Sequence, residues 1–196
     1  MPHDFRESLA KSHAQEDAEW WPLVYRAAFP DLVSFSSVRQ DGWAQRGGID
    51  RVLVLKSGKT LSVDEKVRYR DYADVLLEVW SVFRAGKGID PGWVAKDLAC
   101  DYIAYAWVPN ERCLLLPFQE LRRVWRKHHD LWWDLATRRS EGFSMVRAAN
   151  NGYETVSVCV PEKILVNAMR DAMLVSWAPV AELPPARSAA SNEFGF

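Results

Sequence analysis

Two carboxylates and one lysine stand at a spacing that could assemble a phosphate-hydrolysing site. Asp64 and Lys66 are separated by a single residue in a β-rich run, and thirteen residues lie between Asp50 and Asp64. Because side chains alternate between the two faces of a strand, Asp64 and Lys66 would share one face, ~6.5–7 Å apart. Neighbouring carboxylates repel unless a cation lies between them, and Mg²⁺ or Mn²⁺ with oxygen ligands meets that need. A metal-activated water oriented by Lys66 is what phosphodiester hydrolysis requires.

A β-hairpin would bring these side chains together. Ile49–Leu55 and Thr60–Arg68 have the composition of strands, and Ser57–Gly58 between them is a tight-turn signal. Asp50 and Asp64 each lie about seven positions from that turn, so the hairpin would place them side by side. The pattern therefore predicts that both carboxylates converge at one end of a sheet.

The alternation of residue types along the second strand predicts which face carries the chemistry. The face opposite Asp64 is mostly apolar and is expected to point into the core; it carries Leu61, Val63, Glu65 and Val67. Glu65 adjoins Asp64, so a register with Glu65 at the site stays open, although only Asp64 lies two residues before Lys66. The competing interpretation of Asp64 and Lys66 is an ordinary surface ion pair, worth ~0–1 kcal/mol.

This pattern resembles the PD-(D/E)XK nuclease motif, in which an aspartate opens one strand and a (D/E)-x-K tripeptide lies on the next. Asp50, Asp64 and Lys66 match its positions, and Ile49 stands where the motif has proline. The chain is similar to small uncharacterised phage and bacterial members of that superfamily. The resemblance implies a restriction-endonuclease-like fold and Mg²⁺ or Mn²⁺ bound by Asp50 and Asp64.

The resemblance also implies a third metal ligand. Many members use an acidic residue on the helix before the hairpin, and Glu19 matches that feature, with Glu16 as the alternative. Such nucleases commonly dimerise to cut two strands, so a homodimer is one expectation. The resemblance implies DNA as the partner. Because the motif does not distinguish the sugar, an RNA substrate stays open.

Other residues near the motif are candidates for the rim of the site and for binding nucleic acid. The rim candidates are Glu65, Glu78 and Gln45, and the DNA-binding candidates are Arg46, Arg68, Tyr69 and Arg70. Arginine binds phosphate bidentately and tyrosine stacks on bases. The competing interpretation of the basic residues is a solvated strand end. A second basic run, Arg122–Arg139, could lie along a phosphate backbone. Alternatively, the helix dipole could stabilise these cations near the C-terminus of a helix without any ligand.

Composition limits the class of protein. The chain has 196 residues, 48% of them apolar, and a formal net charge of −1, so contact with DNA must come from local patches. The three cysteines form no CxxC pair, which argues against a disulfide framework. Neither a secretory signal nor a membrane-spanning run is evident, so we expect a cytoplasmic protein without a membrane partner. We expect one domain over residues 1–178 and a flexible tail over 179–196.

The order of the predicted elements indicates an α/β fold with a central mixed β-sheet flanked by helices. Helices are expected over Ala14–Ala28, Gln119–Ala136 and Glu162–Met173. Val75–Trp80 is expected to be a third strand of the hairpin's sheet, with a loop over Gly86–Gly92. The sequence thus predicts a Mg²⁺-dependent deoxyribonuclease. The alternative is a catalytically inactive protein of the same fold that acts as an interaction module.

Overall fold

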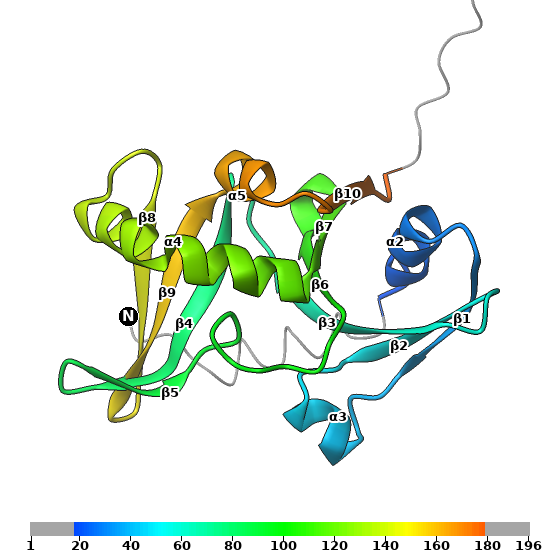
Figure 1. Ribbon diagram of the computed structural model, residues 1–196, viewed down its shortest axis with the longest axis horizontal. Helices are drawn as coiled ribbons and strands as arrows, with labels where there is room; N and C mark the ends of the chain where they lie inside the picture. Colours follow the sequence, from blue (N-terminus) through cyan, green and yellow to red (C-terminus); the bar gives the residue numbers. More distant parts are fainter. Residues whose placement is uncertain (1–17, 179–196) are drawn as a thin grey trace, which may run out of the picture.

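The computed structural model describes residues 18–178, and within them two β-sheets are surrounded by helices (Figure 1). The larger sheet has the order β1 (Leu32–Ser37), β2 (Arg51–Leu55), β3 (Thr60–Arg68), β6 (Tyr102–Trp107), β7 (Arg112–Pro117) and β10 (Met173–Ser176). The smaller sheet has the order β5 (Lys87–Pro91), β4 (Asp74–Arg84), β9 (Tyr153–Pro161) and β8 (Ser144–Asn150). The helices are α2 (Trp21–Ala28), α3 (Gly42–Arg46), α4 (Phe118–Arg138) and α5 (Glu162–Ala168), and a 3₁₀ turn, η1, spans Val108–Asn110.

Alternating apolar residues give the larger sheet two buried faces. On β6, Ile103 and Tyr105 belong to a core shared with the smaller sheet, α4 and α5. Their neighbours Ala104 and Ala106 belong to a second core beneath α2. Every residue of β6 after Tyr102 is buried, which is the pattern of a central strand covered on both sides.

The predicted hairpin is confirmed. β2 and β3 pair in antiparallel register with Arg51 opposite Val63, and Gly58 adopts a positive φ of 81° in the turn that joins them. β3 then pairs in parallel with β6, with Asp64 opposite Ile103 and Lys66 opposite Tyr105. The sheet is therefore mixed, as expected. Because Ile103 and Tyr105 face the smaller sheet, Asp64 and Lys66 face it too.

Several predicted elements were wrong because they depend on long-range pairing. The strand expected over Val75–Trp80 exists as β4 but leaves the hairpin's sheet and pairs with β9 and β5. The expected loop over Gly86–Gly92 contains β5, and β8 was not anticipated. The last helix ends at Ala168 rather than Met173, where β10 begins and pairs with β7.

The fold is a mixed α/β arrangement in which a curled mixed sheet is flanked by helices (Figure 1). Within residues 18–178 no helix is both long and apolar enough to cross a membrane. The predicted tail over 179–196 and Glu16 lie outside the described residues. In the view of Figure 1, α2 and α3 lie on opposite sides of the β1–β2–β3 portion of the larger sheet, and this separation determines which residues can reach the candidate site.

Candidate active site

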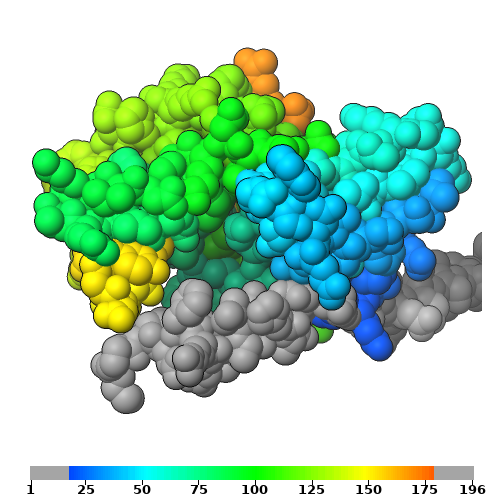
Figure 2. Space-filling view, turned by 90° about the horizontal axis from the view of Figure 1, so that it is seen from below, coloured from blue at the N-terminus to red at the C-terminus, as the bar shows by residue number. Residues whose placement is uncertain are grey.

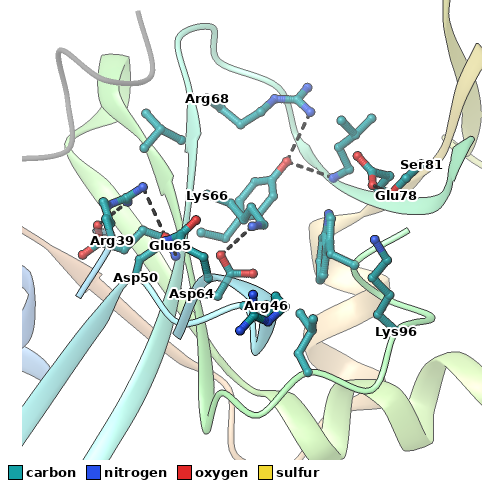
Figure 3. Close-up of a pocket in the computed structure, with 17 residues that line it drawn as sticks. Arg39, Arg46, Asp50, Asp64, Glu65, Lys66, Arg68, Glu78, Ser81 and Lys96 are labelled. Carbon is teal, nitrogen blue, oxygen red and sulfur yellow. Dashed lines mark hydrogen bonds and ion pairs between the residues drawn. The ribbon is translucent and has the colours of Figure 1, made fainter. Parts of the chain in front are cut away.

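A cavity of about 750 Å³ lies between β3 of the larger sheet and β4 of the smaller one. In Figure 2 it is visible as a hollow between the segment around α3, in blue, and the segment around β5, in green. Its polar side chains are drawn in Figure 3. The charged residues that line it are Arg39, Arg46, Asp50, Asp64, Glu65, Lys66, Arg68, Glu78 and Lys96. Acidic and basic groups thus converge in one open cavity.

Asp64 and Lys66 lie next to each other on the β3 wall of the cavity (Figure 3). Both come from the face of β3 that points toward the smaller sheet, and Lys66 Nζ lies 2.5 Å from Asp64 Oδ1. Asp64 is only 3% exposed, so this is not the surface ion pair considered above. Burial raises the pKa of Asp64 to about 6, with Lys66 opposing the shift and Asp50 adding to it. Burial would lower the pKa of Lys66, but Asp64, Asp50 and Glu78 outweigh it and raise the pKa.

Asp50 reaches the same point from the residue before β2. The register that pairs Arg51 with Val63 brings the preceding residue, Asp50, alongside Asp64. Both carboxyls line the cavity, and Asp50 is one cause of the raised pKa of Asp64. The structure therefore brings together all three residues that the spacing pattern singled out.

Glu65 points to the opposite face of β3. Its side chain is fully buried and accepts hydrogen bonds from Arg51 Nε at 2.7 Å, from Arg39 at 2.7 Å and from the hydroxyl of Tyr25. Burial, followed by the charge of Glu65, raises the pKa of Tyr25, so its hydroxyl keeps the proton that it donates. Glu65 thus belongs to a buried ionic cluster behind the site, which disfavours the register that would use Glu65 in place of Asp64.

The two other rim candidates, Gln45 and Glu78, and the DNA-binding candidate Arg46 lie on the α3 and β4 walls of the cavity. Gln45, at the end of α3, has its amide 3.4 Å from Asp50 Oδ1. Arg46, the next residue, also lines the cavity and makes no ion pair within residues 18–178. Glu78 lies on the β4 wall and accepts a hydrogen bond from Ser81 Oγ at 2.6 Å. All three predicted residues therefore reach the cavity.

The basic residues after Lys66 separate into two groups. Arg68 lines the cavity, where it donates to the Tyr105 hydroxyl at 3.2 Å and lies 3.7 Å from Asp74. Tyr69 and Arg70 are exposed and are not among the residues that line the cavity. Of these predicted DNA-binding residues, the structure brings only Arg68 to the site.

Glu19 is not brought to the cavity. It is exposed in the turn before α2, and α2 packs through Trp21 and Val24 on the Glu65 side of the larger sheet. That side is opposite the face that carries Asp64. A ligand on the preceding helix, implied by the family resemblance, is therefore not supplied by Glu19 in this arrangement.

Two charged residues of the cavity, Arg39 and Lys96, could not be identified from the sequence, because tertiary packing brings them there. Arg39 follows β1, and its guanidinium lies 3.2 Å from Asp50 Oδ1 and 2.7 Å from Glu65 Oε2. Lys96 comes from the loop after β5, and Figure 3 shows it across the cavity from Asp64. Neither residue occurs at a spacing that relates it to the Asp-x-Lys tripeptide.

Close packing holds the loop that carries Lys96. A Cβ added to Gly92 would lie 2.2 Å from the carbonyl oxygen of Glu78, so only glycine permits this approach to β4. At the other end of the loop, Asp97 pairs with the buried Arg122 of α4. Part of the basic run on α4 therefore has a structural role, although Arg122 lies near the start of the helix, where the C-terminal dipole interpretation does not apply. Arg138, near the C-terminus of the helix, is likewise paired with Asp134.

The donor set fits a hard divalent cation only in part. Within residues 18–178 there is no group of three or more His, Cys, Asp or Glu side chains arranged to hold a metal ion. Two adjacent carboxylates, Asp50 and Asp64, are nevertheless present, and Mg²⁺ is commonly bound through one or two carboxylates together with waters and substrate phosphates. The raised pKa of Asp64 reflects the cost of burying its charge next to Asp50, and a cation would offset that cost.

No protein-family model, curated protein or solved structure matches this chain. The function of the cavity must therefore be inferred from the chemistry of its own side chains. Those side chains offer two carboxylates, a lysine in contact with one of them, and basic groups around the rim.

Proposed function

We propose that the protein is a metal-dependent nuclease of the PD-(D/E)XK type, with a restriction-endonuclease-like fold, that hydrolyses DNA phosphodiester bonds. The observation that carries the proposal is the convergence of Asp50, Asp64 and Lys66 in a cavity that also contains Arg46 and Lys96. A buried acidic pair next to a lysine is expensive to maintain, which suggests a function rather than a purely structural role. The parallel pairing of β3 with β6 adds support, because it buries the catalytic strand in the middle of a mixed sheet.

Each residue has a distinct role in the proposed chemistry. Asp50 and Asp64 would hold Mg²⁺ or Mn²⁺, which when bound polarises the scissile phosphate and lowers the pKa of a bound water. Lys66 would position the attacking water and offset the negative charge that develops on the phosphate. Its raised pKa keeps Lys66 cationic at neutral pH, as this role requires. Arg46 and Lys96 would bind the phosphates flanking the scissile bond.

The direct test is cleavage by the purified full-length chain of linear, nicked, supercoiled and branched DNA, and of RNA, with Mg²⁺, with Mn²⁺ and with EDTA. Asp64→Asn and Lys66→Ala should each lower cleavage by at least about a hundredfold while leaving thermal unfolding cooperative. Asp71→Asn and Lys59→Ala are matched controls, since both residues are exposed and outside the cavity. Wild-type rates in the Asp64→Asn or Lys66→Ala protein would reject the assignment.

A second candidate function is favoured by the charge pairing within the cavity. Lys66 and Arg39 already form ion pairs with Asp64 and Asp50, so a metal is not the sole source of positive charge for these carboxylates. A catalytically inactive protein of this fold, acting as an interaction module, would keep such pairs and bind no Mg²⁺. Isothermal titration of the protein with MgCl₂ and MnCl₂ separates the two functions, because only the nuclease should bind a cation in a manner lost in Asp64→Asn.

A further inference from the structure

The helix that contributes Gln45 and Arg46 to the cavity also carries a large exposed indole. Trp43, the second residue of α3, is 81% exposed, the highest value among the large apolar side chains of the described residues. Tryptophan usually buries most of its surface, because its ring has a large apolar area. The exposure of Trp43 is therefore costly, and it occurs on the same short helix that contributes Gln45 and Arg46 to the cavity.

The short helix that carries Trp43 is firmly anchored. At its start, the carboxylate of Asp41 accepts hydrogen bonds from the backbone N–H groups of Trp43 at 2.7 Å and Ala44 at 3.3 Å. At its end, the backbone N–H of Ala99 donates to the carbonyl of Gly47 at 2.8 Å, joining α3 to the loop that also lines the cavity. An aromatic ring on a rigid support loses little conformational freedom when a ligand stacks on it.

Arg46 connects the indole to the cavity. Its guanidinium carbon lies 4.5 Å from the centroid of the Trp43 ring, and the same side chain lines the cavity that holds Asp50 and Asp64. Arginine in this position can contact a phosphate with its N–H groups while its plane packs against an aromatic ring. A phosphate bound at Arg46 would therefore place the adjoining nucleotide beside the exposed indole.

We infer that Trp43 stacks on an unpaired base of a nucleic-acid strand whose phosphate is bound by Arg46. Within a duplex both faces of an interior base are already stacked, so a single indole gains a partner only from a single-stranded segment, a frayed end or a flap. This inference rests on the proposed function, since it assigns to the same cavity a substrate class: DNA with an unpaired strand.

Binding measured without cleavage tests the inference separately from the nuclease activity. The full-length Asp64→Asn protein is titrated in EDTA into a fluorescein-labelled single-stranded DNA 15-mer and into the blunt duplex of the same sequence, with fluorescence anisotropy as the readout. Adding Trp43→Ala should weaken binding of the single strand about 5–100-fold, the range for loss of one stacked base, and leave the duplex within twofold. Trp43→Phe should restore most of the loss, since a smaller aromatic ring still stacks.

The control is Leu131→Ala, which removes another exposed apolar side chain, on α4 and outside the cavity. It should leave both affinities unchanged. Single-strand binding that is unaffected by Trp43→Ala, an equal loss for single strand and duplex, or no binding of either DNA would overturn the inference. If the wild-type protein cleaves DNA and Trp43→Ala does not weaken single-strand binding, the proposed function survives and the inference fails. If instead the wild-type protein cleaves no DNA but single-strand binding depends on Trp43, the stacking inference survives and the proposed nuclease function fails.

Discussion

The backbone N–H of Glu65 donates a hydrogen bond to Oδ2 of Asp50 at 2.8 Å. The backbone N–H of Asp50 in turn donates to the carbonyl of Val63 at 2.9 Å. These two bonds tie Asp50 to the main chain of β3 on either side of Asp64. The relative position of the two carboxylates is therefore set by strand pairing, which is more rigid than a contact between flexible side chains.

Arg39 adds a second restraint on Asp50. Its guanidinium contacts Asp50 on the cavity side and Glu65 in the buried cluster, so one planar cation bridges the two faces of β3. Arginine suits this position because its donors are arranged in a fixed fork. The cavity is thus supported from behind by charged groups that have no direct part in the proposed chemistry.

The raised pKa of Asp64 predicts a specific pH dependence of stability. Because the pKa is about 6 in the folded protein and ~3.9 in an unfolded chain, the folded state binds the proton more tightly. The stabilisation from this group is complete below about pH 4 and is lost as the pH rises through about 6, a change of about 3 kcal/mol. In Asp64→Asn this component should be absent.

Urea unfolding in EDTA at several pH values between 4 and 7 measures this effect. The difference in unfolding free energy between wild type and Asp64→Asn reports Asp64 together with its coupling to Asp50 and Lys66, since the more distant carboxylates titrate alike in both proteins. Wild type should lose stability relative to the variant over that interval. Parallel pH profiles would show that Asp64 is ionised with an ordinary pKa.

Glu65→Gln should destabilise the protein, in contrast to Asp64→Asn. The substitution removes the negative charge that compensates Arg51, whose side chain is 6% exposed, and breaking a buried pair from one side costs about 3 kcal/mol or more. Chemical denaturation of the variant measures that loss. Glu19→Gln, at an exposed position, is the matched control and should be neutral. A stable Glu65→Gln protein without cleavage activity would instead favour the register that places Glu65 at the site.

Arg46→Ala should reduce the salt dependence of DNA binding. If Arg46 contacts one phosphate, the slope of log K against log salt should become shallower by about 0.7–0.9 in the variant. Arg70→Ala serves as the control, because Arg70 is exposed and outside the cavity. Binding measured by anisotropy from about 50 to 200 mM salt gives both slopes. Equal slopes for wild type and Arg46→Ala would remove Arg46 from the phosphate-binding surface.

Gly48→Ala should perturb the site through the backbone. Gly48 lies two residues before Asp50 and has a φ of 66°. A Cβ at this position would lie 2.9 Å from both methyl carbons of Leu98. Gly58→Ala is the control: its φ is 81°, but its Cβ would meet nothing within 4 Å. Both variants should lose about 1 kcal/mol from the left-handed backbone conformation, and Gly48→Ala should lose measurably more. Equal unfolding free energies for the two variants would show that Leu98 moves aside without cost.

The local sequence pattern was sufficient to predict the hairpin and which side chains of β3 share a face. Strand alternation placed Asp64 and Lys66 on one side of β3 and Glu65 on the other, and the turn at Gly58 set the register that brings Asp50 to Asp64. These features depend on residues close together in the chain, whose hydrogen-bonding partners are limited by the geometry of a short turn. For the same reason the candidate triad could be identified before any tertiary contact was known.

Only the tertiary structure decided what surrounds the triad. The pairing of β4 with β9 and of β3 with β6 joins segments far apart in the sequence, and no local signal distinguishes those partners from others of similar composition. That pairing separates β4 from the hairpin's sheet and opens the cavity, with Lys96 on its far wall. The pairing of β1 with β2 brings Arg39 to Asp50, and the packing of α2 on the opposite core leaves Glu19 on the far side. The sequence by itself thus determined which groups could do chemistry, and long-range packing determined which of them meet.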